Sequence, residues 1–301
     1  MKEMDLTPFR HLYPFESRYM EIDGLNYHYI DEGSGEPIVM VHGNPTWSFY
    51  FRSAISALST AYRTIAPDHI GCGLSEKPDV SRYDYRLRSR TDNLETFLDR
   101  LGLRENMTLL LHDWGGMIGM AYAVKYPERI RRIILLNTAA FFPPGAKPLP
   151  LRLRLMRNFG FFSTGLILGC NLFAYSALWM ASRQGLSRSV RQGLIAPYNN
   201  WRNRTATLKF VRDIPMNKKD PSYPVVQQVD KNLHRLKGHP FLICWGEHDF
   251  VFDKDYLAEW ERRFPDAEVH RFPNAGHYVL EDATEEIISR IRSFLDRHPL
   301  R

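Results

Sequence analysis

An apolar run that ends in an aspartate, shortly before two glycines, is the first feature of this sequence that suggests chemistry. Residues 109–117 read LLLHDWGGM. A strand that turns sharply into a glycine-containing helix has the shape of a nucleophile elbow, in which a strained turn exposes one side chain above a sheet. The serine pattern GxSxG is absent, because Leu111 replaces its first glycine and Asp113 its serine. Asp113 is therefore a candidate carboxylate nucleophile, with a role as helix N-cap as the structural alternative.

Two later turns supply the partners that such a nucleophile needs. An apolar run at 241–245 leads into GEHD at 246–249, and the turn PNAGHY at 273–278 presents His277 before a helix. Nucleophile, acid and histidine follow one another in this order in α/β-hydrolases. The order predicts that Asp249 orients His277 and that His277 activates water against an intermediate on Asp113. Taken singly, a turn aspartate and a packed loop histidine remain the structural alternatives.

Two further residues are candidate donors to developing negative charge. The segment HGNPTW at 42–47 follows an apolar strand, where this kind of fold places a loop with its backbone N–H groups turned to the reacting centre. Asn44 adds a side-chain amide there, and Trp114 adds an indole N–H next to the nucleophile. A turn asparagine and a core tryptophan are the structural alternatives.

The sequence contains no pattern for a metal, a nucleotide or a nucleic acid. Its eleven histidines form no HExxH, its three cysteines lie far apart without CxxC spacing, and neither GxGxxG nor GKS/GKT occurs. The glycine-containing loop DHIGCGLS at 68–75 is interpreted as a structural turn. We therefore expect no cofactor, no metal and no nucleic-acid partner, and an apolar small molecule as the substrate.

Alternating strands and helices position these residues. The strands are predicted as continuous apolar runs, which is typical of strands buried on both faces of a parallel sheet. The helices are predicted from apolar residues spaced three and four apart. The pattern predicts an α/β fold with a mostly parallel central sheet and helices on both faces. The predicted strands are 25–30, 37–41, 63–66, 107–111, 130–136 and 241–245, and the predicted helices are 49–58, 87–101, 115–126, 255–264 and 285–295.

The alternation stops between residues 139 and 215, where the sequence predicts an inserted, wholly helical cap. The core is then formed by residues 1–138 and 216–301. Of 301 residues, 44% are hydrophobic and 25% charged, which is a globular composition that excludes disordered and fibrous proteins. The whole chain carries a net charge of +6. Thirteen basic residues and one acidic residue, Asp213, lie between Lys147 and Lys219, so this stretch alone carries +12.

The cap also contains 25 residues without a charge, at 158–182. That length is sufficient to cross a bilayer, but polar residues interrupt it, and a crossing would separate the two halves of the predicted site. We expect a lid helix pair packed on its own core, with peripheral contact to a membrane or to an acidic pathway enzyme as the alternative use of the basic cap. The N-terminal stretch is unlike a signal peptide and the cysteines are few, so a cytoplasmic location is expected.

Several segments resemble the haloalkane dehalogenase group of α/β-hydrolases over nearly the whole chain. These segments are HGNPTW, PDHIGCGLSEKP, HDWGG, WGEHD and GHYVLED. The resemblance implies Asp113 as nucleophile, His277 as water-activating base and Asp249 as its orienting acid. It also implies Asn44 and Trp114 as stabilisers of a leaving halide or an oxyanion. Some members carry the acid after an earlier strand, at a position that is Asn137 here and cannot serve as an acid.

Within this group the sequence is most similar to the β-lactone decarboxylases of long-chain olefin biosynthesis. NTAAF at 137–141, APYNNW at 196–201, DIP at 213–215 and GHYVLED at 276–282 resemble theirs, also within the cap. The resemblance implies conversion of long-chain cis-3,4-dialkyl β-lactones to cis-alkenes and carbon dioxide, and the apolar cap suits long alkyl chains. The alternatives are haloalkane hydrolysis, epoxide hydrolysis with Tyr175 or Tyr198 as acid, and a non-catalytic scaffold that binds through its cap.

Overall fold

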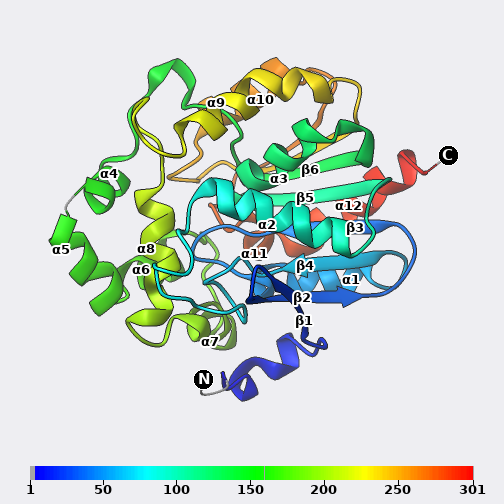
Figure 1. The fold of residues 1–301 in the computed structure, drawn as a ribbon. Coiled ribbons are helices and arrows are strands. Elements are labelled where there is room, and N and C mark those ends of the chain that lie inside the picture. Colours follow the sequence, from blue (N-terminus) through cyan, green and yellow to red (C-terminus); the bar gives the residue numbers. More distant parts are fainter. Residues whose placement is uncertain (1–3, 159, 301) are drawn as a thin grey trace.

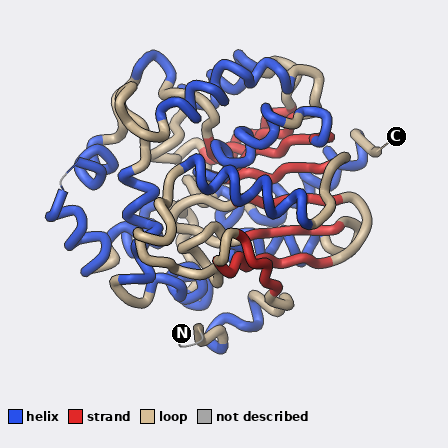
Figure 2. Tube along the Cα trace, in the orientation of Figure 1, coloured by secondary structure: helices blue, strands red, loops and turns tan. Residues whose placement is uncertain are grey.

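The computed structural model describes residues 4–158 and 160–300. An eight-stranded sheet runs through its centre in the order β1-β2-β4-β3-β5-β6-β7-β8 (Figures 1 and 2). β2 is antiparallel to both of its neighbours, β1 and β4, and all other neighbouring strands are parallel. The predicted α/β fold with a mostly parallel sheet is confirmed. The strands are β1 (Arg18–Ile22), β2 (Leu25–Glu32), β3 (Pro37–Val41), β4 (Arg63–Pro67), β5 (Met107–Asp113), β6 (Ile130–Thr138), β7 (Phe241–Gly246) and β8 (Glu268–Phe272).

Helices cover both faces of the sheet because successive strand residues point to opposite sides. In β5, Leu109 and Leu111 join the apolar cluster that contains α2, α3, α9 and α10, whereas Leu110 joins the cluster that contains α1 and α12. These helices are α1 (Arg52–Leu58), α2 (Leu87–Arg100), α3 (Trp114–Lys125), α9 (Tyr223–Asn232), α10 (Lys254–Arg263) and α12 (Thr284–Arg297). The short core elements are η1 (Thr7–Leu12), η2 (Ser48–Phe51), η3 (Pro127–Arg129), η8 (Leu233–Leu236) and α11 (Val279–Asp282).

The predicted elements differ from the observed ones mainly at the sheet edges. β1 and β8 were not predicted, since RYMEI and EVHRF mix polar and apolar residues as edge strands do. The predicted helix 49–58 begins as the 3₁₀ turn η2 before it continues as α1. β5 continues two residues beyond its predicted end and so carries Asp113 at its last position.

Between β6 and α9 the chain forms a group of helices past the carboxyl ends of the strands, at the left in Figure 1. No single helix among the described residues is long and apolar enough to cross a membrane; Gly160–Gly169 and Leu172–Met180 pass that test only together, and they meet at a bend of 69°. The cap elements are η4 (Pro144–Ala146), α4 (Leu151–Asn158), α5 (Gly160–Thr164), the π-helical turn η5 (Gly165–Gly169), α6 (Leu172–Met180), α7 (Arg188–Ile195), η6 (Ala196–Tyr198), η7 (Arg202–Arg204) and α8 (Thr205–Arg212).

Asp213, the acidic residue of the basic stretch, fastens the cap to the core. Its buried carboxylate accepts a 2.7 Å hydrogen bond from the backbone N–H of Leu87 at the start of α2 and a 3.2 Å bond from Arg86. The buried guanidinium of Arg90 lies 3.8 Å away. Charge-assisted bonds of this kind hold α8 against the core and thereby place the cap over the strand ends.

Candidate active site

Asp113 occupies a strained turn between β5 and α3. Its backbone has φ 52° and ψ −127°, a conformation that an ordinary side chain adopts only when the surroundings enforce it. The turn brings α3 so close to β3 that a Cβ at Gly115 would lie 1.9 Å from the carbonyl oxygen of Val41. Gly43 leaves the space that the carboxyl group of Asp113 occupies, since a Cβ there would lie 2.0 Å from Oδ1. These glycines therefore permit the elbow.

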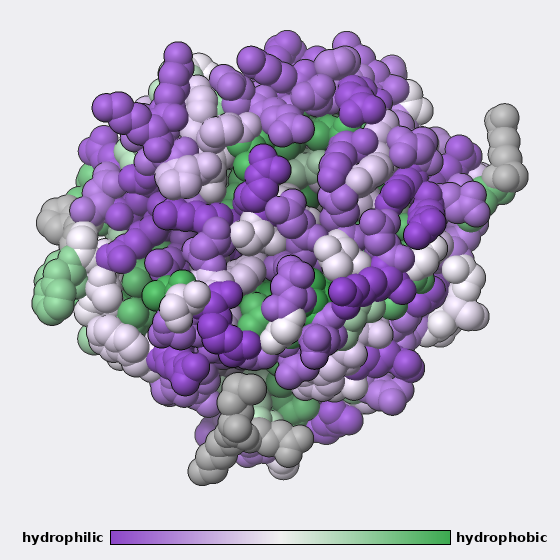
Figure 3. All heavy atoms as spheres, viewed as in Figure 1, coloured by the Kyte–Doolittle hydropathy of each residue, from purple (hydrophilic) through white to green (hydrophobic). Residues whose placement is uncertain are grey.

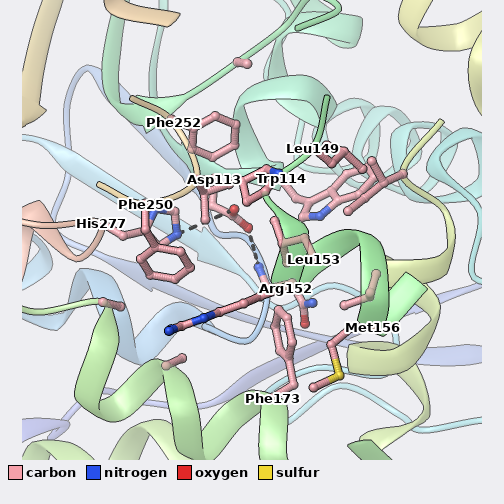
Figure 4. Close-up of a pocket in the computed structure, with 18 of the residues that line it drawn as sticks. Asp113, Trp114, Leu149, Arg152, Leu153, Met156, Phe173, Phe250, Phe252 and His277 are labelled. Atoms are coloured by element: carbon pink, nitrogen blue, oxygen red, sulfur yellow. Dashed lines mark hydrogen bonds and ion pairs between the residues drawn. The ribbon is translucent and has the colours of Figure 1, made fainter. Parts of the chain in front are cut away.

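The Asp113 side chain turns into the site and makes no hydrogen bond that would cap α3. Its Oδ1 accepts a 2.7 Å hydrogen bond from the backbone N–H of Asn44. The backbone N–H of Trp114 also favours the ionised form of the carboxyl group and lowers its pKa. Oδ2 lies 3.6 Å from Nε2 of His277 (Figure 4). One carboxylate oxygen is thus held by the backbone, while the other faces the imidazole.

His277 lies between the two aspartates that the sequence predicts as its partners. Its Nδ1 is 2.8 Å from Oδ2 of Asp249, so that the hydrogen bond fixes the ring with Nε2 towards Asp113. Asp249 is held in turn by the backbone N–H groups of Val251 and Phe252, which donate to Oδ1 over 2.7 and 3.1 Å. The structure therefore brings Asp113, Asp249 and His277 together from the ends of three separate segments.

Asn137 at the end of β6 is a residue whose contribution the sequence did not reveal. It is fully buried, and its Nδ2 donates to Oδ2 of Asp249 over 3.0 Å. The same amide pairs with both the N–H and the carbonyl of Gly246, over 2.7 and 3.0 Å. Asn137 thus joins the ends of β6 and β7 and orients the acid that partners His277.

Burial and neighbouring charge shift the pKa values of both reacting groups. Burial raises the pKa of Asp113, and His277 together with the N–H groups of Asn44 and Trp114 moderates the rise. For His277, burial alone would lower the pKa, but the charge and hydrogen bond of Asp249, with Asp113, outweigh it and raise the pKa above 6.5. Burial thus makes the Asp113 carboxylate less favourable than in water, while the imidazole of His277 binds a proton more readily.

Asn44 and Trp114 both line the site, although Asn44 is partly committed to the cap. Its Nδ2 donates to the backbone carbonyl of Thr207 in α8 over 3.2 Å, which uses one of the two amide hydrogens. The ring of Trp114 packs on Phe210 of the same helix, with ring centroids 5.3 Å apart. Both predicted donors therefore lie where core and cap meet.

A cavity of about 720 Å³ opens above Asp113, between the core and the cap. Of the described residues around it, three are ionisable groups with charge at or near neutral pH: Asp113, Arg152 and His277 (Figure 4). The rest of the lining is almost entirely apolar. Residues from the core include Met117, Phe250, Phe252 and Tyr256, and residues from the cap include Phe141, Leu149, Leu153, Leu155, Met156, Phe173, Ala177 and Met180.

Arg152 belongs to the basic stretch of the cap, for which contact with a membrane is the alternative expectation, and it lines this cavity. Its Nη1 lies 3.4 Å from Sδ of Met180. The sequence alone does not distinguish Arg152 from Arg154 and Arg157, because only the packing of α4 on the core decides which arginine faces the cavity. Tyr175 and Tyr198, offered as acids for epoxide opening, are not among the described residues around the cavity; the Tyr198 hydroxyl bonds to the carbonyl of Thr46 over 3.3 Å.

Comparisons with known proteins agree with this architecture. Residues 36–284 match the model of the alpha/beta hydrolase fold family. A cis-3-alkyl-4-alkyloxetan-2-one decarboxylase of Shewanella oneidensis is 50% identical over 94% of this chain and 89% of that protein. Haloalkane dehalogenase 2 of Mycobacterium bovis is 33% identical over 96% of this chain and 98% of its own length. The structure of a variant of haloalkane dehalogenase DatA from Agrobacterium tumefaciens superposes with a TM-score of 0.82 at 25% identity, covering 94% and 97% of the two chains.

An oxetan-2-one is a four-membered β-lactone, so both resemblances predicted from the sequence motifs are confirmed. The chain belongs to the α/β-hydrolase fold family, in the group that contains the haloalkane dehalogenases and the cis-3-alkyl-4-alkyloxetan-2-one decarboxylases.

Proposed function

We propose that this protein is a decarboxylase that converts long-chain cis-3,4-dialkyl β-lactones to cis-alkenes and carbon dioxide. The observation that carries the proposal is the buried Asp113 carboxylate at the base of a large, almost wholly apolar cavity. Burial of apolar surface is worth about 25 cal/mol per Å², so long alkyl chains gain binding energy there that a small haloalkane cannot. The 50% identity to a protein named for this reaction supports the same choice.

Asp113 is the nucleophile in this proposal. Its Oδ1 is held by the backbone N–H of Asn44, which leaves Oδ2 as the attacking atom. Oδ2 attacks the ring carbon that carries the lactone oxygen. A C–O bond to Asp113 forms, the ring C–O bond breaks, and the lactone carboxyl group leaves that carbon as a carboxylate. The new negative charge is met by the donors of Asn44 and Trp114, which would meet a leaving halide in the same way.

The second step returns the enzyme to its starting state. The C–C bond to the carboxylate breaks, its electron pair forms the alkene, carbon dioxide departs, and the Asp113 oxygen leaves as a carboxylate. Attack inverts the ring carbon, and an anti elimination then places both alkyl groups on the same side, which gives a cis-alkene from a cis-lactone. No water or proton is consumed. His277 therefore acts here by lowering the pKa of Asp113, which favours its ionised form, while Asp249 holds the His277 ring in place.

Arg152 offers a counter-charge for the carboxylate that appears when the ring opens. It lines the same cavity as Asp113, and a guanidinium binds a planar carboxylate through two parallel hydrogen bonds. A spherical halide cannot use that geometry. Arg152 is thus the residue whose chemistry separates a lactone from a haloalkane in this site.

Haloalkane hydrolysis is the second candidate, favoured by the distance of 3.6 Å between His277 Nε2 and Asp113 Oδ2. A neutral His277 in that position can deprotonate a water that attacks an alkyl ester on Asp113, while Asp249 stabilises the imidazolium. Unlike decarboxylation, this reaction requires water and a general base.

The test offers the purified protein a long-chain cis-β-lactone and a bromoalkane of matched length in separate assays. We expect cis-alkene and carbon dioxide from the lactone, measured by gas chromatography with mass spectrometry. Bromide release without any alkene would overturn the ranking. Asp113→Asn is the control for background reaction, because a thermally labile β-lactone also loses carbon dioxide without an enzyme.

The site of this activity in the cell is proposed to be the cytoplasm. All three cysteines, Cys72, Cys170 and Cys244, are free thiols, which agrees with a reducing compartment. Fractionation of cells that produce the protein tests this, and recovery from an exported fraction would contradict it.

A further inference from the structure

The cap carries a second apolar surface, on the side away from the cavity. We define the cap face as Phe161 and Phe162 of α5 with Tyr175 and Trp179 of α6. Phe161 is 93% exposed, Trp179 70% and Phe162 63%. Figure 3 shows apolar atoms that project from the left edge, where Figure 1 places α5, among largely hydrophilic surroundings. Such a gathering of exposed aromatic residues is uncommon on a protein that meets only water.

The sequence of α6, LFAYSALWM, is apolar around its whole circumference. Phe173, Ala177 and Met180 line the cavity, whereas Tyr175 and Trp179 are half or more exposed on another side. A helix that is apolar all round is normally buried on all sides, whereas a surface helix keeps a polar outer face. The substrate cavity covers only one side of α6. We therefore expect the exposed apolar side to contact a second apolar environment.

Positive charge flanks the cap face. No charged residue lies between 158 and 182, while Arg154 precedes this stretch and Arg183, Arg188 and Arg191 follow it. Arg154 and Arg188 are exposed, and the Arg191 guanidinium lies over the Trp179 ring at 4.6 Å. An apolar centre with aromatic residues and an arginine border matches the acyl boundary and the anionic headgroups of a phospholipid bilayer.

We propose that the cap face docks on the surface of an anionic phospholipid bilayer. α5 and α6, which belong to segments that meet at a bend of 69°, then lie in the interface. The helix that contacts the lipid is also a wall of the cavity above Asp113. If the proposed function holds, a water-insoluble lactone enters the site from the bilayer, and the alkene returns to it.

The experiment measures docking without any substrate, so that its outcome is independent of the catalytic assignment. The full chain is floated with phosphatidylcholine vesicles and with vesicles of phosphatidylcholine and phosphatidylglycerol. We expect flotation with the anionic vesicles, weaker flotation with the neutral ones, and loss of most binding on raising the salt from about 0.1 to 0.5 M, because surface charge is then screened.

Two double variants separate the apolar and the electrostatic parts. F161S/W179S removes apolar contacts and R154S/R188S removes border charge, and each is expected to lower the vesicle-bound fraction at least fivefold. The matched controls are Val80→Ser, an exposed apolar residue outside the cap, and R88S/R104S, which removes two exposed arginines of the core. Both controls should float as the parent protein does. Thermal unfolding and turnover of a short-chain, dispersed substrate verify that each variant is folded.

Several outcomes would overturn the proposal. One is equal flotation of the parent and both cap variants; another is no flotation of the parent with either vesicle. Self-association that F161S/W179S abolishes, without vesicle binding, would assign the cap face to a second copy of the chain. If the protein binds anionic vesicles but does not turn over the lactone, the proposed function is contradicted and the docking proposal is not.

Discussion

Asn137 donates a hydrogen bond from its Nδ2 to Oδ2 of Asp249 over 3.0 Å, although 112 positions separate the two residues. The amide thus holds the carboxylate that binds Nδ1 of His277. It also satisfies the buried N–H and carbonyl of Gly246. The Asn137 side chain therefore both joins the ends of β6 and β7 and orients Asp249, the partner of His277.

Asn137→Ala is expected to lower the free energy of unfolding by about 1–3 kcal/mol, because it leaves buried polar groups without partners. It should also lower kcat more than it changes KM, since Asp249 loses a donor and His277 its fixed orientation. Urea unfolding and steady-state kinetics measure the two effects. Asn26→Ala, at an exposed asparagine, is the control. Unchanged kcat in a folded Asn137→Ala protein would contradict the positioning role.

Asp113→Asn is expected to abolish turnover of both lactone and bromoalkane, because an amide oxygen is a poor nucleophile. The thermal midpoint should not fall. The raised pKa of Asp113 means that the folded protein disfavours its ionised form, so a neutral side chain of the same shape relieves that cost. Calorimetry and product assays check this, with exposed Asp266→Asn as control. Residual alkene formation above the uncatalysed rate would exclude Asp113 as the nucleophile.

His277→Ala should affect the two candidate reactions differently. Hydrolysis of a bromoalkane needs a base for water, so turnover should fall about 10²–10⁴-fold while the alkyl ester on Asp113 accumulates. Intact-protein mass spectrometry detects this adduct as the mass of the alkyl group. Decarboxylation needs no water, so lactone turnover should fall less in this variant than bromoalkane turnover. Exposed His11→Ala is the control. The absence of any adduct from a bromoalkane would argue against a covalent step.

The pH dependence follows from the direction of the two pKa shifts. Hydrolysis requires neutral His277, and its raised pKa means that hydrolysis declines once the pH falls through a value above 6.5. Decarboxylation requires only ionised Asp113, so it should persist to lower pH and then fall at a pH higher than for an ordinary aspartate with a pKa of 3.8. Profiles of kcat/KM for both substrates test this. If kcat/KM falls at the same acidic pH for both substrates, His277 must also be neutral for decarboxylation.

Arg152→Leu is expected to reduce lactone turnover at least tenfold and to leave bromoalkane turnover within about twofold, because only the lactone yields a planar carboxylate. Leucine keeps an aliphatic side chain at this position and removes the charge. Arg154→Leu, two residues further along α4 and not among the described residues of the cavity lining, is the matched control. An equal loss with both substrates would assign Arg152 to the integrity of the cap rather than to carboxylate binding.

The sequence by itself determined the α/β alternation, the inserted cap and the candidates Asp113, Asp249, His277, Asn44 and Trp114. These features leave local signals: apolar runs mark buried parallel strands, and short turns at strand ends carry the chemical side chains. The edge strands β1 and β8 left no such signal, because an edge strand is only partly buried and its polar residues break the apolar run.

Only the tertiary structure decided which residues meet. It placed Asn137 on Asp249, turned Arg152 into the cavity while Arg154 stayed outside, and left the cap face exposed. The physical reason is that a side chain's neighbours depend on the packing of elements far apart along the chain. A helix such as α6, apolar on every side, does not reveal in its sequence which side will meet the substrate cavity and which will face outward.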